Sequence, residues 1–479
     1  MMKPLFLLSV LAVSIATNAQ NFRRTFGWGS YNTAPSFVQT PDSGFALLGS
    51  FSSATSFQTD FVLMRADTAG VFQWAKAYGG NGVDEARDII QLADSGWLLV
   101  GFSNSFSPNN DYDGYLVRLN SSGDTVWTKT IGTAAWDFFY DVVVSSSGNF
   151  MLSGATNGST NGRTAGWLVE ISPSGNVINQ DRFESGLSNY FLRATIDANG
   201  DIFFAGYNEN PNSLEKHGLV VKYDAITLDT VWTFTYQTTD EDVINDIKLL
   251  PNGNIAICGV RQLNGTTNDD NLIAVLQPNG SLLWQESVNL PGSSSYNKLQ
   301  ILGDTLIAGG YTSDFGEGGK DMLVNWFNSA GTFIKGNTLG YSQDELLYDF
   351  DLTNDNQFIL FGTTTSYGPG LQSMLLARTD TAFSLGTNIV IGINEQEKNN
   401  SLVTVFPNPV NNLLTIRKPV DIGTLEYSLF NVTGEQLVKG EIVTAEYTLP
   451  IANLPTGVYM LIVKNNTNLI SRYRIIVEH

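Results

Sequence analysis

A short apolar segment that ends in glycine recurs seven times along the chain. The segments read FALLG, WLLVG, FMLSG, IFFAG, IAICG, TLIAG and FILFG, and they end at Gly49, Gly101, Gly154, Gly206, Gly259, Gly309 and Gly362. Successive glycines are 52, 53, 52, 53, 50 and 53 residues apart. A fixed period of this size is typical of repeat architectures, so the first 380 or so residues are expected to form one body.

Each repeat predicts four short strands separated by turn residues, with no helical periodicity between them. One unit, from Asp60 to Gly101, contains the strands DFVLMRAD, VFQWAKAYGG, RDIIQLA and WLLVG. Four-stranded units at this period are typical of the blades of a β-propeller. The WLLVG-like strands are apolar on both faces, as sheets packed between neighbours require. We attribute their terminal glycines to close packing between blades.

The two ends of the repeat region predict a closed ring. The N-terminal part supplies three strands, NFRRTFG, PSFVQT and FALLG, and lacks a DFVLMRAD-like strand. That strand recurs at the far end as MLLARTD, from Met374 to Asp380. Pairing it with the N-terminal three would complete one blade, remove exposed sheet edges and give seven blades. An open solenoid is the alternative, and it leaves the split repeat unexplained.

Four segments follow from these patterns. Residues 1–19 read as a signal peptide, because a lysine precedes a short apolar stretch and small residues stand before Gln20. Residues 20–383 form the predicted propeller, and residues 384–400 a polar linker. Residues 401–479 hold about six or seven short strands with clear turn signals, which predicts a small Ig-like β-sandwich. The predicted fold class is therefore all-β.

Composition narrows the function. The formal net charge of −20 argues against nucleic-acid binding and against docking on anionic lipid. The single cysteine, Cys258, lies in an apolar strand and is expected to be buried. Only two histidines are present, which disfavours zinc sites and a Ser-His-Asp triad. We therefore expect no cofactor.

Two parts of the chain resemble known families. The unit WAKAYGGNGVDEARDIIQLADSGWLLVG resembles a bacterial β-propeller repeat over about residues 22–383, which implies a fold and no single activity. The C-terminal part resembles the sorting domain of the type IX secretion system of Bacteroidetes. The motif residues that carry this resemblance are Phe406, Pro407, Asn408, Pro409, Gly434, Gly457 and Tyr459.

The second resemblance implies a route and partners. A chain of that family crosses the inner membrane by its signal peptide and is then recognised by the outer-membrane translocon. A sortase removes the C-terminal domain, and the cargo is released or linked to the surface. The resemblance thus implies a secreted or outer cell-surface protein. The cleavage is expected in the solvent-exposed linker.

Acidic residues offer the candidate sites. Asp88, Asp141, Asp246 and Asp349 occupy one repeat position just before a strand, and Arg193 takes the same place in the third unit. These residues are expected at a common height, either as a ring that binds a cation or polar ligand or as a repeated hydrogen bond to loop backbone. Asp111 and Asp113 match the opening of a calcium loop, although Asn120 replaces its final glutamate, and turn capping is the alternative.

No nucleotide-binding, serine-hydrolase or metalloprotease motif is present in the sequence. We therefore expect a secreted binding or adhesion module for a glycan or a protein rather than an enzyme. A polysaccharide hydrolase or lyase, which would need convergent carboxylates, and a structural surface-layer protein are the alternatives.

Overall fold

The computed structural model of the chain describes residues 21–27, 31–52, 58–107, 109, 111–210, 212–237, 241–262, 268–287, 291–353, 357–381, 383, 403–407, 410–419, 423–430, 436–455, 457–464 and 469–477. The predicted signal peptide and linker lie outside the described residues, so both stay predictions.

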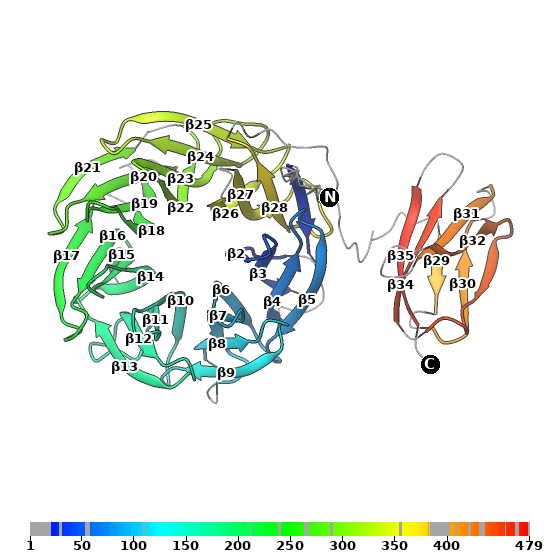
Figure 1. Cartoon of the computed structure of the whole chain (residues 1–479), viewed down its shortest axis with the longest axis horizontal. Coiled ribbons are helices and arrows are strands. Elements are labelled where there is room, and N and C mark those ends of the chain that lie inside the picture. Colours follow the sequence, from blue (N-terminus) through cyan, green and yellow to red (C-terminus); the bar gives the residue numbers. More distant parts are fainter. Residues whose placement is uncertain are drawn as a thin grey trace, which may run out of the picture.

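Seven four-stranded antiparallel sheets follow one another around a common axis between Phe22 and Thr379 (Figure 1). Six of them are consecutive in the chain: β2–β5 (Ser36–Gln39, Phe45–Ser52, Thr59–Ala66, Phe72–Tyr78), β6–β9 (Asp84–Gln91, Trp97–Ser103, Asp113–Leu119, Thr125–Ile131), β10–β13 (Asp137–Val144, Phe150–Thr156, Ala165–Ile171, Val177–Phe183), β14–β17 (Ser188–Ile196, Ile202–Glu209, Lys216–Tyr223, Thr230–Tyr236), β18–β21 (Asp242–Leu249, Ile255–Gln262, Asp269–Leu276, Leu282–Ser287) and β22–β25 (Ser294–Leu302, Thr305–Thr312, Asp321–Phe327, Phe333–Leu339).

The last of the seven sheets joins both ends of this region. It has the order β26-β27-β28-β1, where β26 is Glu345–Leu352, β27 is Phe358–Thr364, β28 is Ser373–Thr379 and β1 is Phe22–Phe26. The pairing of β1 with β28 runs from Phe22 opposite Arg378 to Phe26 opposite Met374. This pairing joins the first strand of the region to its last sheet and so closes the ring.

The sheets begin two strands later than the predicted units, which corrects our division of the closing blade. Only β1 joins the last sheet, whereas the strands PSFVQT and FALLG pair with each other and share a sheet with β4 and β5. The unit from Asp60 to Gly101 therefore straddles two sheets. Both hairpins in it are as predicted, but the pairing of β7 with β8 places the boundary at the loop between β5 and β6.

A β-bulge explains the repeated glycines. In six sheets the innermost strand skips one residue opposite its neighbour, for example between Phe139 and Asp141. The bulge brings a carbonyl so close that a Cβ at Gly154 would overlap the oxygen of Phe138. The same overlap recurs at Gly101, Gly206, Gly259, Gly310 and Gly362. The glycines thus serve pairing within a blade, and our attribution to packing between blades is wrong as the main cause.

The same comparison corrects one repeat position. Gly310, and not Gly309, lies opposite the residue that precedes the bulge in its sheet, because Tyr296 pairs with Gly310.

Neighbouring sheets pack through apolar cores between their faces; one such core joins Leu98 and Leu116 to Phe139 and Trp167. The second strands β7, β11 and β27 are buried along their whole length, as strands covered on both faces must be.

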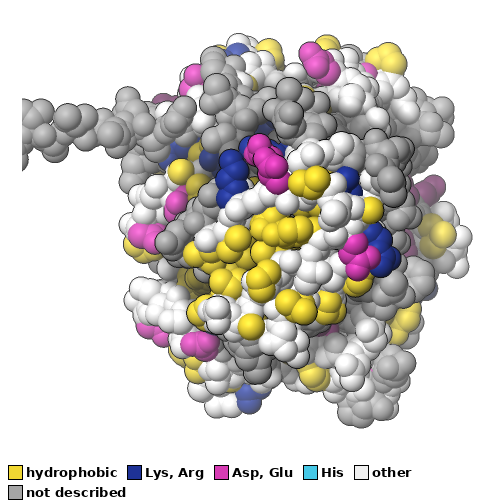
Figure 2. Space-filling model, turned by 90° about the vertical axis from the view of Figure 1, so that its right-hand side faces the viewer, with side chains coloured by type: hydrophobic (Ala, Val, Ile, Leu, Met, Phe, Trp, Pro, Cys, Tyr) yellow, Lys and Arg dark blue, Asp and Glu magenta, His cyan; other side chains and the backbone are white. Residues whose placement is uncertain are grey.

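The C-terminal residues form two further antiparallel sheets. One has the order β29-β30-β33 (Thr404–Phe406, Leu413–Arg417, Glu446–Pro450), and the other β32-β31-β34-β35 (Gln436–Ile442, Leu425–Phe430, Gly457–Lys464, Leu469–Val477). They share one apolar core that includes Leu414, Tyr427 and Leu461. Figure 1 draws these strands on the right, and Figure 2 shows the molecule from that side. Hydrophobic side chains gather on this surface, and charged side chains lie at the edge of the hydrophobic area.

Candidate functional site

The predicted aspartates lie at one equivalent position of the innermost strands. Each pairs with the residue before a repeated glycine, as Asp88 does with Val100. The register adds two members that the sequence comparison missed, Ser36 in β2 and Lys298 in β22. We call the seven residues the inner ring: Ser36, Asp88, Asp141, Arg193, Asp246, Lys298 and Asp349. In six of the seven sheets the innermost strand begins at least four residues before its member of the inner ring, and in the remaining sheet Ser36 is the first residue of β2. The members of the inner ring therefore lie within strands and not before them.

The carboxylates of the inner ring connect neighbouring blades. Asp88 accepts the backbone N–H of Val142 at 3.2 Å, and Asp141 accepts that of Ala194 at 2.8 Å. Asp246 and Asp349 repeat the contact with Leu299 at 2.8 Å and Phe37 at 3.2 Å. Each acceptor bonds the residue that follows the ring member of the next blade. We call these four hydrogen bonds clasps, because each one connects a carboxylate of one blade to the backbone of the next blade.

Two of the four carboxylates of the inner ring lie near a cation of the same ring. Lys298 lies 3.2 Å from Asp349, and Arg193 lies 3.9 Å from Asp141. Burial raises the pKa of Asp141 to about 7, with a further contribution from Asp88, while Arg193 opposes the shift. Burial lowers the pKa of Arg193, yet the surrounding carboxylates raise it above its ordinary value. Removing a whole member of such a buried charged network is therefore expected to be strongly destabilising.

The raised pKa of Asp141 predicts a pH dependence of stability. Burial also raises the pKa values of Asp113 and Asp321 to about 6. Between pH 4 and their folded pKa values the folded chain binds more protons than the unfolded chain, so the free energy of unfolding rises as pH falls from 8 to 5. Each fully shifted group contributes up to about 1.4 kcal/mol per pH unit. Denaturant titrations across this range measure the slope, and Asp141→Asn should reduce it; an unchanged slope in this variant contradicts the assignment.

The predicted calcium position is a tight acidic turn. Asp111 accepts a hydrogen bond from the hydroxyl of Ser107, and Asp113 begins β8 with 7% of its surface exposed. Its pKa is raised by burial first and then by Asp111 and Asp137. Among the described residues no group of three or more His, Cys, Asp or Glu side chains could hold a metal ion. Calcium binding therefore stays a prediction.

An aromatic cluster lies where β7 and β10 approach each other, and sequence reasoning missed it. Phe102 and Phe138 have ring centroids 4.9 Å apart, and Tyr112 lies 5.5 Å from Phe102. Trp136 lies 5.8 Å from Tyr112 and is 53% exposed. Phe138 stacks on Tyr140 at 6.2 Å with nearly parallel planes. The five rings, Phe102, Tyr112, Trp136, Phe138 and Tyr140, are the aromatic cluster.

One cation lies against this cluster. The guanidinium carbon of Arg87 lies 5.1 Å from the ring centroid of Phe102 and 5.9 Å from that of Tyr140. Arg87 also pairs with Glu85 at 2.9 Å. The signal in the sequence is the alternation of Trp136, Phe138 and Tyr140, because alternate residues of a strand share a face. The tertiary structure adds Phe102 and Tyr112 from the neighbouring blade.

The predicted sorting residues divide between described and undescribed parts. Phe406 ends β29 under the guanidinium of Arg417, whose carbon lies 4.9 Å from the ring centroid, and Pro407 follows it. Gly457 begins β34, and the Tyr459 hydroxyl donates to the carbonyl of Pro455 at 2.7 Å. Tyr459 belongs to the core of this domain. Three residues of the motif lie outside the described residues: Asn408, Pro409 and Gly434.

The comparison with protein families identifies the C-terminal region. Residues 404–478 match the family described as the secretion system C-terminal sorting domain. The chain is thus a β-propeller protein with a sorting domain at its C-terminus. It is exported by the type IX secretion system, and it is a secreted or cell-surface protein. No helix among the described residues is long and apolar enough to cross a membrane.

Comparison with curated proteins gives no match. Among solved structures, Sqt1 from Chaetomium thermophilum shares 12% identity with a TM-score of 0.43, over 72% of this chain and 82% of Sqt1. PorZ, a surface component of the type IX secretion system of Porphyromonas gingivalis, shares 11% identity with a TM-score of 0.28, over 93% and 81%. An α-L-arabinanase from Penicillium chrysogenum shares 9% identity with a TM-score of 0.42, over 75% and 98%. Values this low carry no inference about function.

Proposed function

We propose that this chain is an extracellular binding protein whose seven sheets are the blades of one closed propeller and whose C-terminal sheets form an Ig-like sandwich. The sandwich directs export through the type IX translocon and its sortase. The propeller is the delivered part, and it binds a polysaccharide at the aromatic cluster. A protein ligand on the same surface is the second form of this binding function.

The aromatic cluster is the observation that carries this proposal. Aromatic side chains on a protein surface offer rigid apolar faces, which pack well against the C–H face of a sugar ring. Trp136 is 53% exposed, and connected aromatic rings at a surface mark interaction sites. Arg87 adds donors beside the rings. The cluster therefore combines stacking surface with hydrogen-bonding capacity.

The inner ring gives no support to the hydrolase alternative. Glycosidic bond cleavage needs two carboxyl groups that flank the substrate. The four ring aspartates are 4–8% exposed, and each accepts a backbone N–H of the next blade. Carboxylates engaged in this way act as clasps, so we favour binding over catalysis.

Trp136→Ala tests the binding surface. The full chain, screened on a glycan array and then titrated with the tightest oligosaccharide, is expected to lose about tenfold or more in affinity on this substitution. The melting temperature should stay within 2 °C or so, because an exposed side chain contributes little to the core. Val126→Ala, at an exposed residue of β9, is the matched control. Release of reducing ends by the unmodified chain, or equal affinity in Trp136→Ala, would contradict the proposal.

A further inference from the structure

A cavity lies between the sheets β18–β21 and β22–β25, which follow the strands of the aromatic cluster in the chain. It has a volume of about 460 Å³, within the range of small-molecule sites. Its walls include the rings of Tyr296, Phe315, Phe327 and Phe333. Phe315 and Phe333 are each 56% exposed. The cavity thus has aromatic walls whose outer members face solvent.

Two asparagines line this cavity at positions that are apolar or glycine in other blades. Asn271 pairs with Val260. The equivalent positions hold glycine in three sheets and a large apolar residue in the other three: Gly114, Gly166, Gly218, Phe61, Met322 and Met374. A Cβ at any of these glycines would press on the next blade, on Phe139, Phe191 or Ile244. Asn271 is therefore the only polar side chain among the seven equivalent residues of the seven described sheets.

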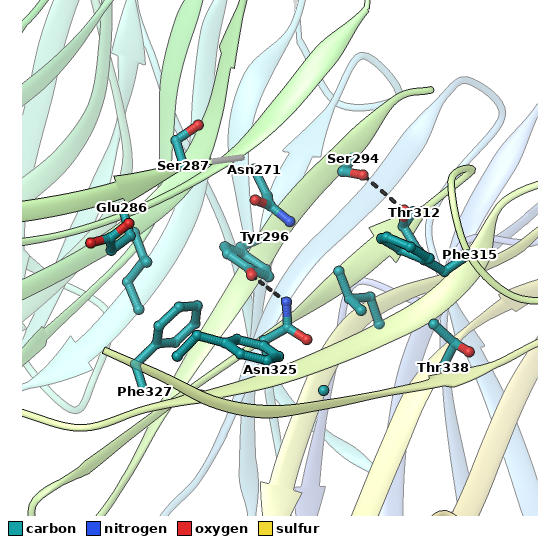
Figure 3. A pocket seen from close by; sticks show the side chains of 14 residues that line it. Asn271, Glu286, Ser287, Ser294, Tyr296, Thr312, Phe315, Asn325, Phe327 and Thr338 are labelled. Atoms are coloured by element: carbon teal, nitrogen blue, oxygen red, sulfur yellow. Dashed lines mark hydrogen bonds between the residues drawn. The ribbon is translucent and has the colours of Figure 1, made fainter. Parts of the chain in front are cut away.

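The second asparagine, Asn325, occupies a core position. Its equivalents are all fully buried apolar residues: Met64, Val117, Val169, Val221, Ala274 and Ala377. The Asn325 amide donates to the Tyr296 hydroxyl at 2.6 Å. Figure 3 shows Asn271, Tyr296 and Asn325 turned toward the same space. Departures from the repeat at two facing core positions indicate a functional constraint at this interface.

The wall of the cavity also carries side chains that can form hydrogen bonds with a ligand. The Asn271 side chain, which is 7% exposed, lines the cavity. The hydroxyl of Ser287 is buried without a partner among the described residues. Ser294 and Thr312, in contrast, satisfy each other at 2.8 Å. A buried hydroxyl without a partner costs free energy until a ligand completes its hydrogen bond.

We infer that this cavity binds one ring of a neutral sugar, as a specific subsite of the proposed polysaccharide-binding function on which the inference rests. A sugar ring pairs an apolar face with hydroxyl groups that both donate and accept, which matches aromatic walls around amides. An acyl chain would leave Ser287 unsatisfied. Glu286 on the wall and the net charge of −20 disfavour an acidic sugar.

Two substitutions that restore the repeat provide the test. Asn271→Gly and Asn325→Val introduce residues that other blades carry, so the fold should tolerate both, with melting temperatures equal to or above that of the unmodified chain. Each is expected to lower the affinity for the tightest neutral oligosaccharide of a glycan array about tenfold or more by calorimetric titration. Phe315→Ala should weaken binding as well. Its control is Phe106→Ala, at the equivalent exposed position of another blade, which should bind unchanged.

The outcomes separate this inference from the proposed function. If Trp136→Ala abolishes glycan binding while Asn271→Gly and Asn325→Val bind normally, the cavity inference is wrong and the proposed function stands. If no glycan binds the unmodified chain, both fail. Palmitate, tested in parallel, decides the ligand class, because palmitate binding that is lost in Asn271→Gly without any sugar binding would overturn the assignment to a sugar.

Discussion

Replacing Gly154 by alanine is expected to lower the free energy of unfolding of the propeller by at least about 3 kcal/mol. The bulge before Asp141 places the carbonyl oxygen of Phe138 where the new Cβ would lie, and the Cα of Phe139 stands 3.3 Å from it. Backbone atoms of a paired strand cannot move aside as a flexible side chain can. The substitution must therefore break the bulge or the pairing of β10 with β11.

Gly148→Ala is the matched control for this experiment. Gly148 lies in the turn between the same two strands, has a φ of +81°, and a Cβ there would meet nothing within 4 Å. Its substitution should cost only the left-handed conformation, about 1 kcal/mol. Chemical denaturation of both variants gives the comparison. Equal stability losses would show that the repeated glycines serve backbone conformation and not the bulge.

Asp246→Ala is expected to destabilise the propeller by about 3 kcal/mol, as removal of one member of a buried charged network does. Asp246 is 4% exposed and accepts the N–H of Leu299 at 2.8 Å. Its charge also acts on Arg193 and Lys298, whose pKa values the ring carboxylates raise. The substitution leaves one backbone donor without its acceptor and removes one of the carboxylates that favour the charged forms of Arg193 and Lys298.

A graded series separates the two contributions. Asp246→Asn keeps an acceptor for Leu299 but removes the charge, so its stability loss should be smaller than that of alanine. Asp304→Ala, at an exposed residue of the turn between β22 and β23, should be neutral. Denaturant unfolding measures all three. If the ring instead binds a cation or polar ligand, Asp88→Asn and Asp141→Asn would lose that ligand; unchanged binding with lower stability supports the clasps.

The period of the sequence predicted the strands well because each turn carries its own local signal. The turn at Asp94-Ser95-Gly96, for example, forms the expected hairpin between β6 and β7, and Ser95 has a φ of +65°. Equivalence along the chain also placed the four aspartates at one height. Local signals could not show which longer connection stays inside a sheet, since the loops after β5 and β7 both carry Gly, Asn or Ser.

The members of the candidate sites were harder to predict than the strands. Ser36 and Lys298 share no chemistry with aspartate, so only the hydrogen-bonding register assigns them to the inner ring. Phe102 reaches Phe138 from another blade, 36 residues earlier in the chain. Asn271 and Asn325 attract notice only when they are compared with their equivalents in the other blades. The contacts of Ser36 and Lys298 with Asp349, and of Phe102 with Phe138, all cross from one blade to the next.

The sequence by itself determined the seven-fold repeat, the four strands of each unit and the export domain, because hydrophobic alternation, turn residues and the sorting motif are all local. The tertiary structure decided where each blade begins, that β1 alone closes the ring, and why the glycines are needed. It also brought together the inner ring, the aromatic cluster and the cavity at Asn271. Pairing register and packing between blades depend on contacts far apart in the chain, and a repeat period carries no information about those contacts.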